Sequence, residues 1–272
     1  MKLVTVRTAD GHRAARIEGD ALVLLDAADV GALLAGDWRT TGAADGPRIP
    51  LAGADLAPVV PKPEKIICVG LNYRSHAEET GLGIPEYPTI FAKYTRAIIG
   101  PYDDVQLPPN SDRVDWEAEL TIVVGEELRY ADVATAAKGI AGYTVANDVS
   151  MRDWQTRTNQ WLQGKTFEGS TPVGPAVATL DEFDNPDDLH HVCEVDGVIV
   201  QETRTADLIF SPAEILSYIS GIITLVPGDL ILTGTPSGIG ARKDPPQYLV
   251  NGTKVRTWID GIGELSNTCV AV

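Results

Sequence analysis

Two glutamates separated by one residue have the spacing of a paired metal ligand. Glu117 and Glu119 occur in the largely apolar segment 116–124. Successive side chains of a β-strand point to opposite faces, so residues two apart share a face. The same pattern is typical of a strand that turns its glutamates to solvent and buries Ala118 and Leu120. The pair alone therefore leaves both interpretations open.

A third carboxylate favours the metal site. Asp148 follows the apolar segment 140–146, which is expected to be another strand. Three neighbouring carboxylates repel one another unless a divalent cation neutralises them, and Mg²⁺, Mn²⁺ and Ca²⁺ all accept ligation by oxygen alone. The sequence leaves open whether Glu117, Glu119 and Asp148 converge in the fold.

One of the four histidines has a carboxylate at helical spacing. His76 and Glu79 would share one face of a helix over residues 75–80. A carboxylate beside an imidazole fixes its tautomer and raises its basicity, as a general base that activates water requires. The alternative is a solvated surface pair. His190 and His191 follow an acidic loop and are expected to be exposed.

Cationic residues follow the third carboxylate. Arg152 and Gln155 are three residues apart and share one face of a helix expected over 150–158. Lys165 lies between glycines in the segment 162–172, which lets the backbone and the ammonium group approach an anion closely. These residues are candidates for contact with an anionic substrate.

Several functional classes lack support. The glycine-rich segment 232–240 has neither the Gly/Lys spacing of a P-loop nor the pattern of a dinucleotide-binding turn, and no G-x-S-x-G elbow occurs. With 22 Lys+Arg against 38 Asp+Glu, the net charge is −16 and no basic block is present. Such a chain does not attract nucleic acid or an anionic membrane surface.

The cysteines and the apolar segments indicate a cytoplasmic protein. Cys68, Cys193 and Cys269 are far apart and form no C-x-x-C pair, which argues against a disulfide framework and a structural zinc site. No signal-peptide pattern begins the sequence, and the longest apolar stretch, 215–226, is too short to span a bilayer.

The elements that must position these residues are mostly strands. The composition includes 26 Gly and 18 Pro, as is typical of a turn-rich β protein. A helix is expected from Pro212, with Ser211 as its N-cap. The proline-rich segment 58–63 reads as a linker. We therefore expect a small N-terminal domain over residues 1–60 and a larger domain over 61–272.

Five segments in this order resemble the fumarylacetoacetate hydrolase family: GLNYRSHAEE (70–79), DWEAEL (115–120), GYTVANDVSMRDWQ (142–155), GKTFEGSTPVGP (164–175) and LTGTPSGIG (232–240). The resemblance implies a mainly β fold with some α, in which a mixed β-roll or β-sandwich catalytic domain follows a small α+β N-terminal domain. It also implies a homodimer.

The resemblance implies a role for each candidate residue. Mg²⁺ or Mn²⁺ would be bound by Glu117, Glu119 and Asp148. His76 and Glu79 would polarise a water molecule from a segment that orders as a lid, and Lys165 would be the active-site lysine. Substrate contacts are expected from Arg152, Gln155, Thr235 and Tyr73.

The expected reaction is metal-dependent hydrolysis of a carbon–carbon bond in a small anionic 2-oxo acid of the acylpyruvate type. The metal would serve as Lewis acid, and Lys165 would stabilise the developing enolate. Alternatives are oxaloacetate decarboxylation, keto–enol or double-bond isomerisation of a 2-hydroxymuconate-type diacid, and a non-catalytic metal-binding ligand sensor. The segment 81–100, with Tyr87, Lys93 and Tyr94, is expected to contact the variable part of the substrate.

Overall fold

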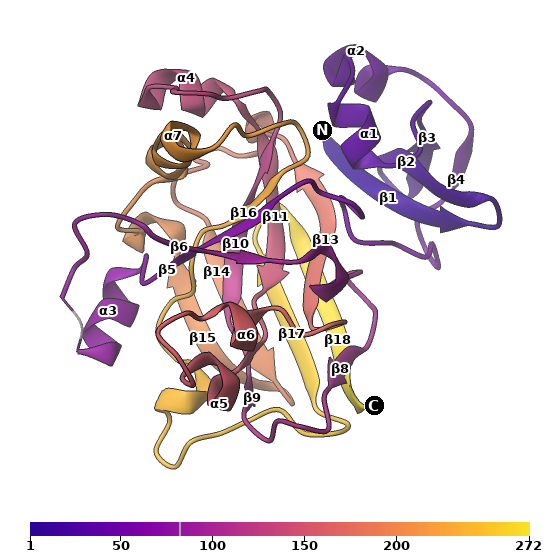
Figure 1. Cartoon of the computed structure of the whole chain (residues 1–272). Helices are drawn as coiled ribbons and strands as arrows, with labels where there is room; N and C mark the ends of the chain where they lie inside the picture. Colours follow the sequence, from indigo (N-terminus) through magenta and orange to yellow (C-terminus); the bar gives the residue numbers. More distant parts are fainter. Residues whose placement is uncertain (82) are drawn as a thin grey trace.

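A computed structural model describes residues 1–81 and 83–272 of the chain. Strands form most of its regular structure (Figure 1). Their bounds are β1 Lys2–Thr8, β2 Gly11–Glu18, β3 Ala21–Leu24, β4 Arg48–Pro50, β5 Ile66–Gly70, β6 Thr89–Lys93, β7 Ile98–Ile99, β8 Val105–Leu107, β9 Val114–Asp115, β10 Ala118–Val124, β11 Ile140–Asn147, β12 Ser150–Met151, β13 Thr171–Ala178, β14 His190–Val195, β15 Val198–Arg204, β16 Leu230–Leu232, β17 Lys254–Ile259 and β18 Gly263–Ala271.

The helices are short and lie at the edges of the strands (Figure 1). Their bounds are α1 Val30–Leu34, α2 Trp38–Ala43, α3 Arg74–Thr80, α4 Val133–Lys138, α5 Arg152–Gln155, α6 Leu162–Lys165 and α7 Pro212–Ile222. Single 3₁₀ turns occur at η1 Thr95–Ala97, η2 Leu180–Glu182, η3 Thr205–Asp207 and η4 Gly240–Arg242. None of the helices in the described ranges is long and apolar enough to cross a membrane.

Two sheets form the body of the molecule. The larger has the strand order β4-β3-β2-β1-β13-β11-β10-β16-β5-β6, and the smaller has the order β15-β14-β17-β18-β8. Strands β10, β11 and β13 pack against β14, β17 and β18. The apolar core between them includes Leu120, Val145 and Leu265, all fully buried. The expected mainly β fold with some α is confirmed.

The central strands β10 and β11 are buried along their whole length. Their sequences, AELTIVV and IAGYTVAN, are rich in the β-branched residues that pack well in covered sheets. The interpretation of Glu117 and Glu119 as a wet strand face is therefore wrong, because both side chains are buried and Glu117 contacts Arg152 of α5 and Lys165 of α6.

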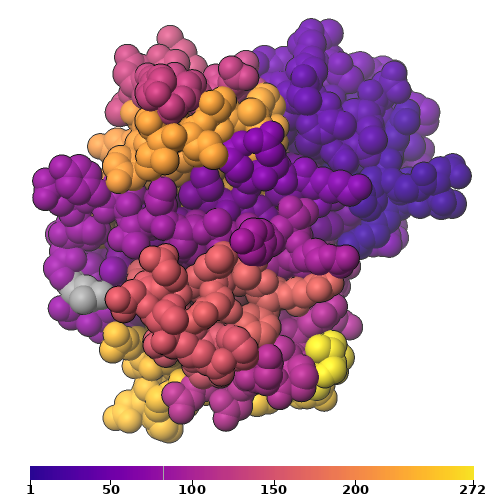
Figure 2. Space-filling model, viewed as in Figure 1, coloured from indigo at the N-terminus to yellow at the C-terminus, as the bar shows by residue number. Residues whose placement is uncertain are grey.

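The N-terminal residues form a lobe at one corner of the molecule, coloured indigo in Figures 1 and 2. Strand β1 pairs antiparallel with β13, so this lobe extends the larger sheet. Within the expected linker, Val59 and Val60 are buried in the same apolar cluster as Leu3 and Leu230. The division of the chain at residue 60 stays a prediction.

Helix α7 begins as its sequence indicates. The hydroxyl of Ser211 accepts a hydrogen bond from the Glu214 amide, and the Glu214 carboxylate accepts one from the Ser211 amide. This capping box satisfies two amides that the helix cannot satisfy itself, while Pro212 occupies a position that needs no amide donor. Helix α7 packs against α4 at one end of the sheets.

The expectation that His191 is exposed is wrong. Its side chain is 1% exposed, because β14 lies between β15 and β17 and His191 is paired with Ile259 of the core. Neither ring nitrogen has a hydrogen-bond partner among the described residues. Burial without a partner disfavours the charged imidazolium, and it lowers the pKa of His191 to about 3.

We predict that His191 makes the fold less stable in acid. Below the ordinary histidine pKa of about 6.5, His191 binds a proton in the unfolded chain but stays neutral in the folded chain. The free energy of unfolding therefore falls as the pH drops from about 6.5 towards 3. Denaturant unfolding of wild type should lose about 1.4 kcal/mol per pH unit relative to His191→Leu in this window. The exposed-site control His12→Leu should follow wild type, and parallel curves for all three proteins would refute the prediction.

Candidate active site and metal centre

Antiparallel pairing of β10 with β11 brings three carboxylates together. Ala118 is paired with Asn147, and the Asp148 amide donates to the Glu117 carbonyl oxygen at 2.7 Å. Ligand oxygens of Glu117, Glu119 and Asp148 therefore lie within 4.8 Å of one another. The three residues are 6%, 1% and 0% exposed. The residues expected to bind metal thus form one buried, all-oxygen cluster.

Three cationic side chains surround the carboxylates. The Lys165 ammonium lies 2.6 Å from Oε2 of Glu117 and 2.9 Å from Oδ2 of Asp148. Lys93, at the end of β6, binds the other oxygen of Asp148. The Arg152 guanidinium lies 2.6 Å from Oε1 of Glu117. Glu117 and Asp148 each have cationic partners, but Glu119 has none among the described residues.

This asymmetry appears in the pKa values of the cluster. Burial raises the pKa of Glu117, yet Lys165 and Arg152 outweigh it and lower that pKa to about 2. Burial, then Asp148 and Glu117, raise the pKa of Glu119 well above its ordinary value. Burial lowers the pKa of Lys165, but the neighbouring carboxylates raise it further, so its ammonium stays charged.

The cluster is suited to a divalent cation. It offers three carboxylates, the hard oxygen donors that Mg²⁺ and Mn²⁺ prefer, and one of them lacks a compensating positive charge. A bound divalent ion would supply that charge. The Glu119 carboxylate is already oriented, because its Oε2 accepts the Gly234 amide at 2.7 Å. Gly234 has φ +100°, and a Cβ there would lie 2.9 Å from the Val69 carbonyl oxygen.

His76 and Glu79 form a hydrogen-bonded pair on α3. Nδ1 of His76 lies 2.9 Å from Oε2 of Glu79, and the other Glu79 oxygen accepts the Gly238 amide at 2.8 Å. Burial raises the pKa of Glu79, but its bonds to His76 and Gly238 bring that pKa below its ordinary value. The ionised carboxylate holds the proton on Nδ1, so Nε2 is the nitrogen left to exchange a proton.

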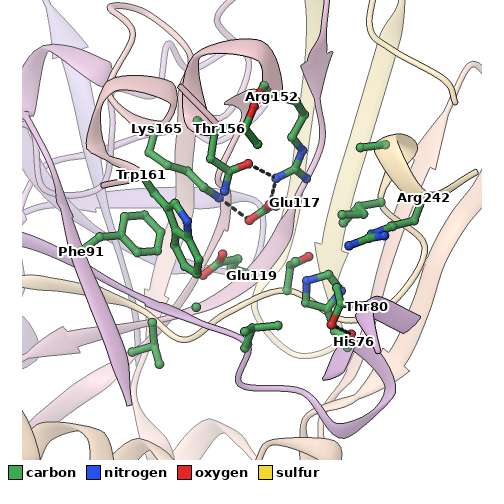
Figure 3. Close-up of a pocket in the computed structure, with 17 residues that line it drawn as sticks. His76, Thr80, Phe91, Glu117, Glu119, Arg152, Thr156, Trp161, Lys165 and Arg242 are labelled. Atoms are coloured by element: carbon green, nitrogen blue, oxygen red, sulfur yellow. Dashed lines mark hydrogen bonds and ion pairs between the residues drawn. The ribbon is translucent and has the colours of Figure 1, made fainter. Parts of the chain in front are cut away.

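A cavity of about 320 Å³ joins the pair to the carboxylates. Figure 3 shows His76 on one side and Glu117 and Glu119 on the other, with Lys165 beyond them. The polar lining includes the predicted residues His76, Glu117, Glu119, Arg152, Gln155, Lys165 and Thr235. Its apolar lining includes Val69, Leu71, Phe91, Trp161 and Ile239.

Tyr73 is the predicted substrate contact that does not line the cavity. Tyr73 precedes α3, is fully buried and is not among the residues that line the cavity. In the segment 81–100, Phe91 lines the cavity and the Lys93 ammonium binds Asp148. Tyr87 and Tyr94 are exposed and do not line the cavity. Residue 82 of this segment lies outside the described residues.

Asp115 is a further buried carboxylate of the site, and its role is not evident from the sequence. One of its oxygens accepts the Gly240 amide at 2.7 Å, and the other binds Nε of Arg152 at 2.8 Å. A Cβ on Gly240 would lie 2.7 Å from this carboxylate, so the close contact requires glycine. Asp115 thus ties Arg152 to the loop that contains η4. The one feature of the sequence that pointed to Asp115 is its position two residues before Glu117.

Comparisons with known proteins identify the family of the chain. Residues 65–270 match the family described as fumarylacetoacetate (FAA) hydrolase, C-terminal. The mitochondrial oxaloacetate tautomerase FAHD2A of Bos taurus is 44% identical over 217 residues, which is 79% of this chain and 69% of that protein. Its Homo sapiens counterpart has the same identity and coverage.

Solved structures extend the likeness to the whole chain. A 5-carboxymethyl-2-hydroxymuconate delta-isomerase from Mycobacterium smegmatis has a TM-score of 0.86 at 34% identity, with 100% of both chains covered. A fumarylacetoacetate hydrolase from Exiguobacterium antarcticum has a TM-score of 0.89 at 29% identity, again over 100% of both chains. The relatives are enzymes, and this chain belongs to the fumarylacetoacetate hydrolase family.

Proposed function

We propose that the site transfers a proton at C3 of a 2-oxo acid and so interconverts the keto and enol forms of an oxaloacetate-type substrate. The observation that carries this proposal is the placement of the His76–Glu79 pair across one cavity from the carboxylate cluster and Lys165. Enolisation requires a base on one side and, on the other, positive charge, which a divalent ion bound by the carboxylates would supply together with Lys165. Similarity to the oxaloacetate tautomerases supports this choice.

The residues divide the reaction between them. Mg²⁺ or Mn²⁺ held by Glu117, Glu119 and Asp148 would act as a Lewis acid toward the 1-carboxylate and the 2-oxo oxygen. Nε2 of His76 accepts the proton from C3, and Glu79 stabilises the imidazolium that results. The imidazolium then gives the proton to the 2-oxo oxygen, which completes the enol and restores neutral His76. The charged Lys165 lies beside the carboxylates, where negative charge develops on the 2-oxo oxygen.

Arg152 is placed to orient the 1-carboxylate. Nη1 binds Glu117 and Gln155, whereas Nη2 is buried and has no hydrogen-bond partner among the described residues. A buried donor without a partner costs free energy that a substrate carboxylate would recover. Gln155 and Thr235 line the same cavity and add polar contacts.

Hydrolysis of an acylpyruvate is the second candidate. His76 lines a cavity of about 320 Å³, which has room for a water molecule beside a small substrate. The same base would then deprotonate that water for attack on the distal carbonyl. Similarity to the Exiguobacterium antarcticum hydrolase supports this candidate. The same assays would detect oxaloacetate decarboxylation. Absence of turnover with every substrate would instead indicate a ligand sensor.

We propose that the functional unit is a cytoplasmic homodimer acting on a small anionic substrate, with no nucleic-acid or membrane partner. The family resemblance supports the dimer, and the net charge of −16 supports the absence of polyanionic partners. The Bos taurus and Homo sapiens relatives are named as mitochondrial proteins. Both the location and the dimer stay predictions.

The decay of enol-oxaloacetate, followed by its ultraviolet absorbance, tests the proposed function. Metal-loaded protein should accelerate the decay, and His76→Gln should slow that reaction by about 10²- to 10⁴-fold because it lacks the proton acceptor. The matched control His12→Gln changes an exposed histidine and should retain wild-type activity. Mass detection of pyruvate from acylpyruvates or oxaloacetate identifies the other reactions. An unchanged rate in His76→Gln would reject the assigned base.

Thermal melting tests the metal. Protein freed of divalent ions should melt about 5–10 °C higher when Mg²⁺ or Mn²⁺ is added at about 100 times its dissociation constant, because only the folded chain has the site. Glu119→Gln should abolish this shift. Without metal the melting temperature of the variant should not be below that of wild type, because a neutral glutamine is not repelled by Asp148 and Glu117. Glu127→Gln, at an exposed position, should shift like wild type; an equal shift in Glu119→Gln would count against the triad.

A further inference from the structure

We propose that Arg242 binds the distal carboxylate of the substrate, so that the site selects 2-oxo dicarboxylates over 2-oxo acids with a neutral tail. This inference rests on the proposed function, because it assigns a binding partner to the end of the substrate that lies away from the carboxylate cluster. It identifies a specificity-determining residue in the loop after β16, which no pattern in the sequence singled out.

Arg242 is the cation of the cavity that remains available. The cavity is lined by Arg152, Lys165 and Arg242. Arg152 and Lys165 each lie 2.6 Å from a Glu117 oxygen and have further carboxylate partners, and the free Nη2 of Arg152 is assigned to the 1-carboxylate, which leaves Arg242 for the distal carboxylate. Arg242 forms no ion pair with any residue in the ranges 1–81 and 83–272.

The Arg242 side chain points into the cavity from the side of His76. In Figure 3 it lies opposite Lys165, with Glu117 between them. Arg242 also lies close enough to Glu79, the partner of His76, for its positive charge to help lower the pKa of Glu79. A substrate held at one end by the carboxylate cluster and exposed at C3 to His76 would extend its tail towards Arg242.

The loop that presents Arg242 is anchored at both ends of the site. The Gly240 and Ala241 amides donate to the Asp115 carboxylate at 2.7 and 3.0 Å. The Gly238 amide donates to Glu79 at 2.8 Å. Asp115 therefore fixes the loop relative to Arg152, and Glu79 fixes it relative to the base. Such anchoring restricts the distance between Arg242 and the reacting atoms, as specific recognition requires.

A carboxylate tail needs this partner. The cavity lining also includes apolar side chains, among them Leu71 and Ile239, and a carboxylate without a partner would lose hydration in such a cavity without compensation. A guanidinium provides two parallel donors that match a carboxylate. A neutral acyl or ester tail gains nothing from Arg242, so removal of this side chain should affect the two substrate types differently.

Kinetics with oxaloacetate and its 4-ethyl ester test the inference, because both present the same 2-oxo carboxylate end. For Arg242→Gln we expect kcat/KM to fall about 10-fold or more with oxaloacetate, mainly through KM, and to stay within about 2-fold with the ester. Arg242→Lys should recover part of the loss. Lys243→Gln removes the same charge from the neighbouring residue, which does not line the cavity, and should retain wild-type discrimination.

Calorimetric binding separates failure of this inference from failure of the proposed function. The ligands are malate, which has no 2-oxo group and so neither enolises nor loses CO₂, and its 4-methyl ester, each added to the metal-loaded protein. Wild type should bind the diacid about 10-fold more tightly than the ester, and Arg242→Gln should bind both alike. If neither oxaloacetate nor its ester is turned over, the proposed function fails. The difference in affinity between the diacid and the ester would still show whether Arg242 binds the distal carboxylate. Equal losses for both substrates, or no preference in wild type, would overturn the inference.

Discussion

Three buried carboxylates whose ligand oxygens lie within 4.8 Å of one another are the constraint on which the rest of the site depends. Such a cluster is unfavourable unless positive charge compensates it. The fold places three cations against it, from the end of β6, from α5 and from α6. The carboxylate without a cation, Glu119, has a raised pKa, and this residual imbalance makes the cluster suited to a divalent ion.

The same charges connect the metal centre with the remainder of the active site. Arg152 binds both Glu117 and Asp115, and Asp115 holds the loop that carries Arg242. That loop also donates to Glu79 and so helps to orient His76. A change in one of these contacts is therefore expected to alter both the base and the substrate-binding end. The global charge of −16 does not describe this cavity, where cationic side chains surround the carboxylates.

Local patterns in the sequence predicted those parts of the site that depend on short-range geometry. The two-residue spacing of Glu117 and Glu119 and the three-residue spacing of His76 and Glu79 indicated shared faces, and both pairs lie together in the structure. The capping residues likewise predicted the start of α7. The convergence of Asp148 depends on the register of β10 with β11, which no local pattern specifies.

Other features depend on tertiary packing and could not be predicted. Lys93 reaches Asp148 across 55 positions of sequence, and Asp115 reaches Gly240 across 125. His191 follows an acidic loop, yet the pairing of β14 on both sides buries it. Tyr73 lies in a motif of the family resemblance, but its side chain is buried away from the cavity lining.

Anomalous diffraction from crystals soaked in Mn²⁺ would show directly whether the three carboxylates bind one divalent ion. We expect a single strong peak bounded by oxygens of Glu117, Glu119 and Asp148, and the same peak should be absent from Glu119→Gln crystals. A Mn²⁺ peak elsewhere, or an empty cluster with Lys93 and Lys165 still seated on the carboxylates at saturating Mn²⁺, would contradict it.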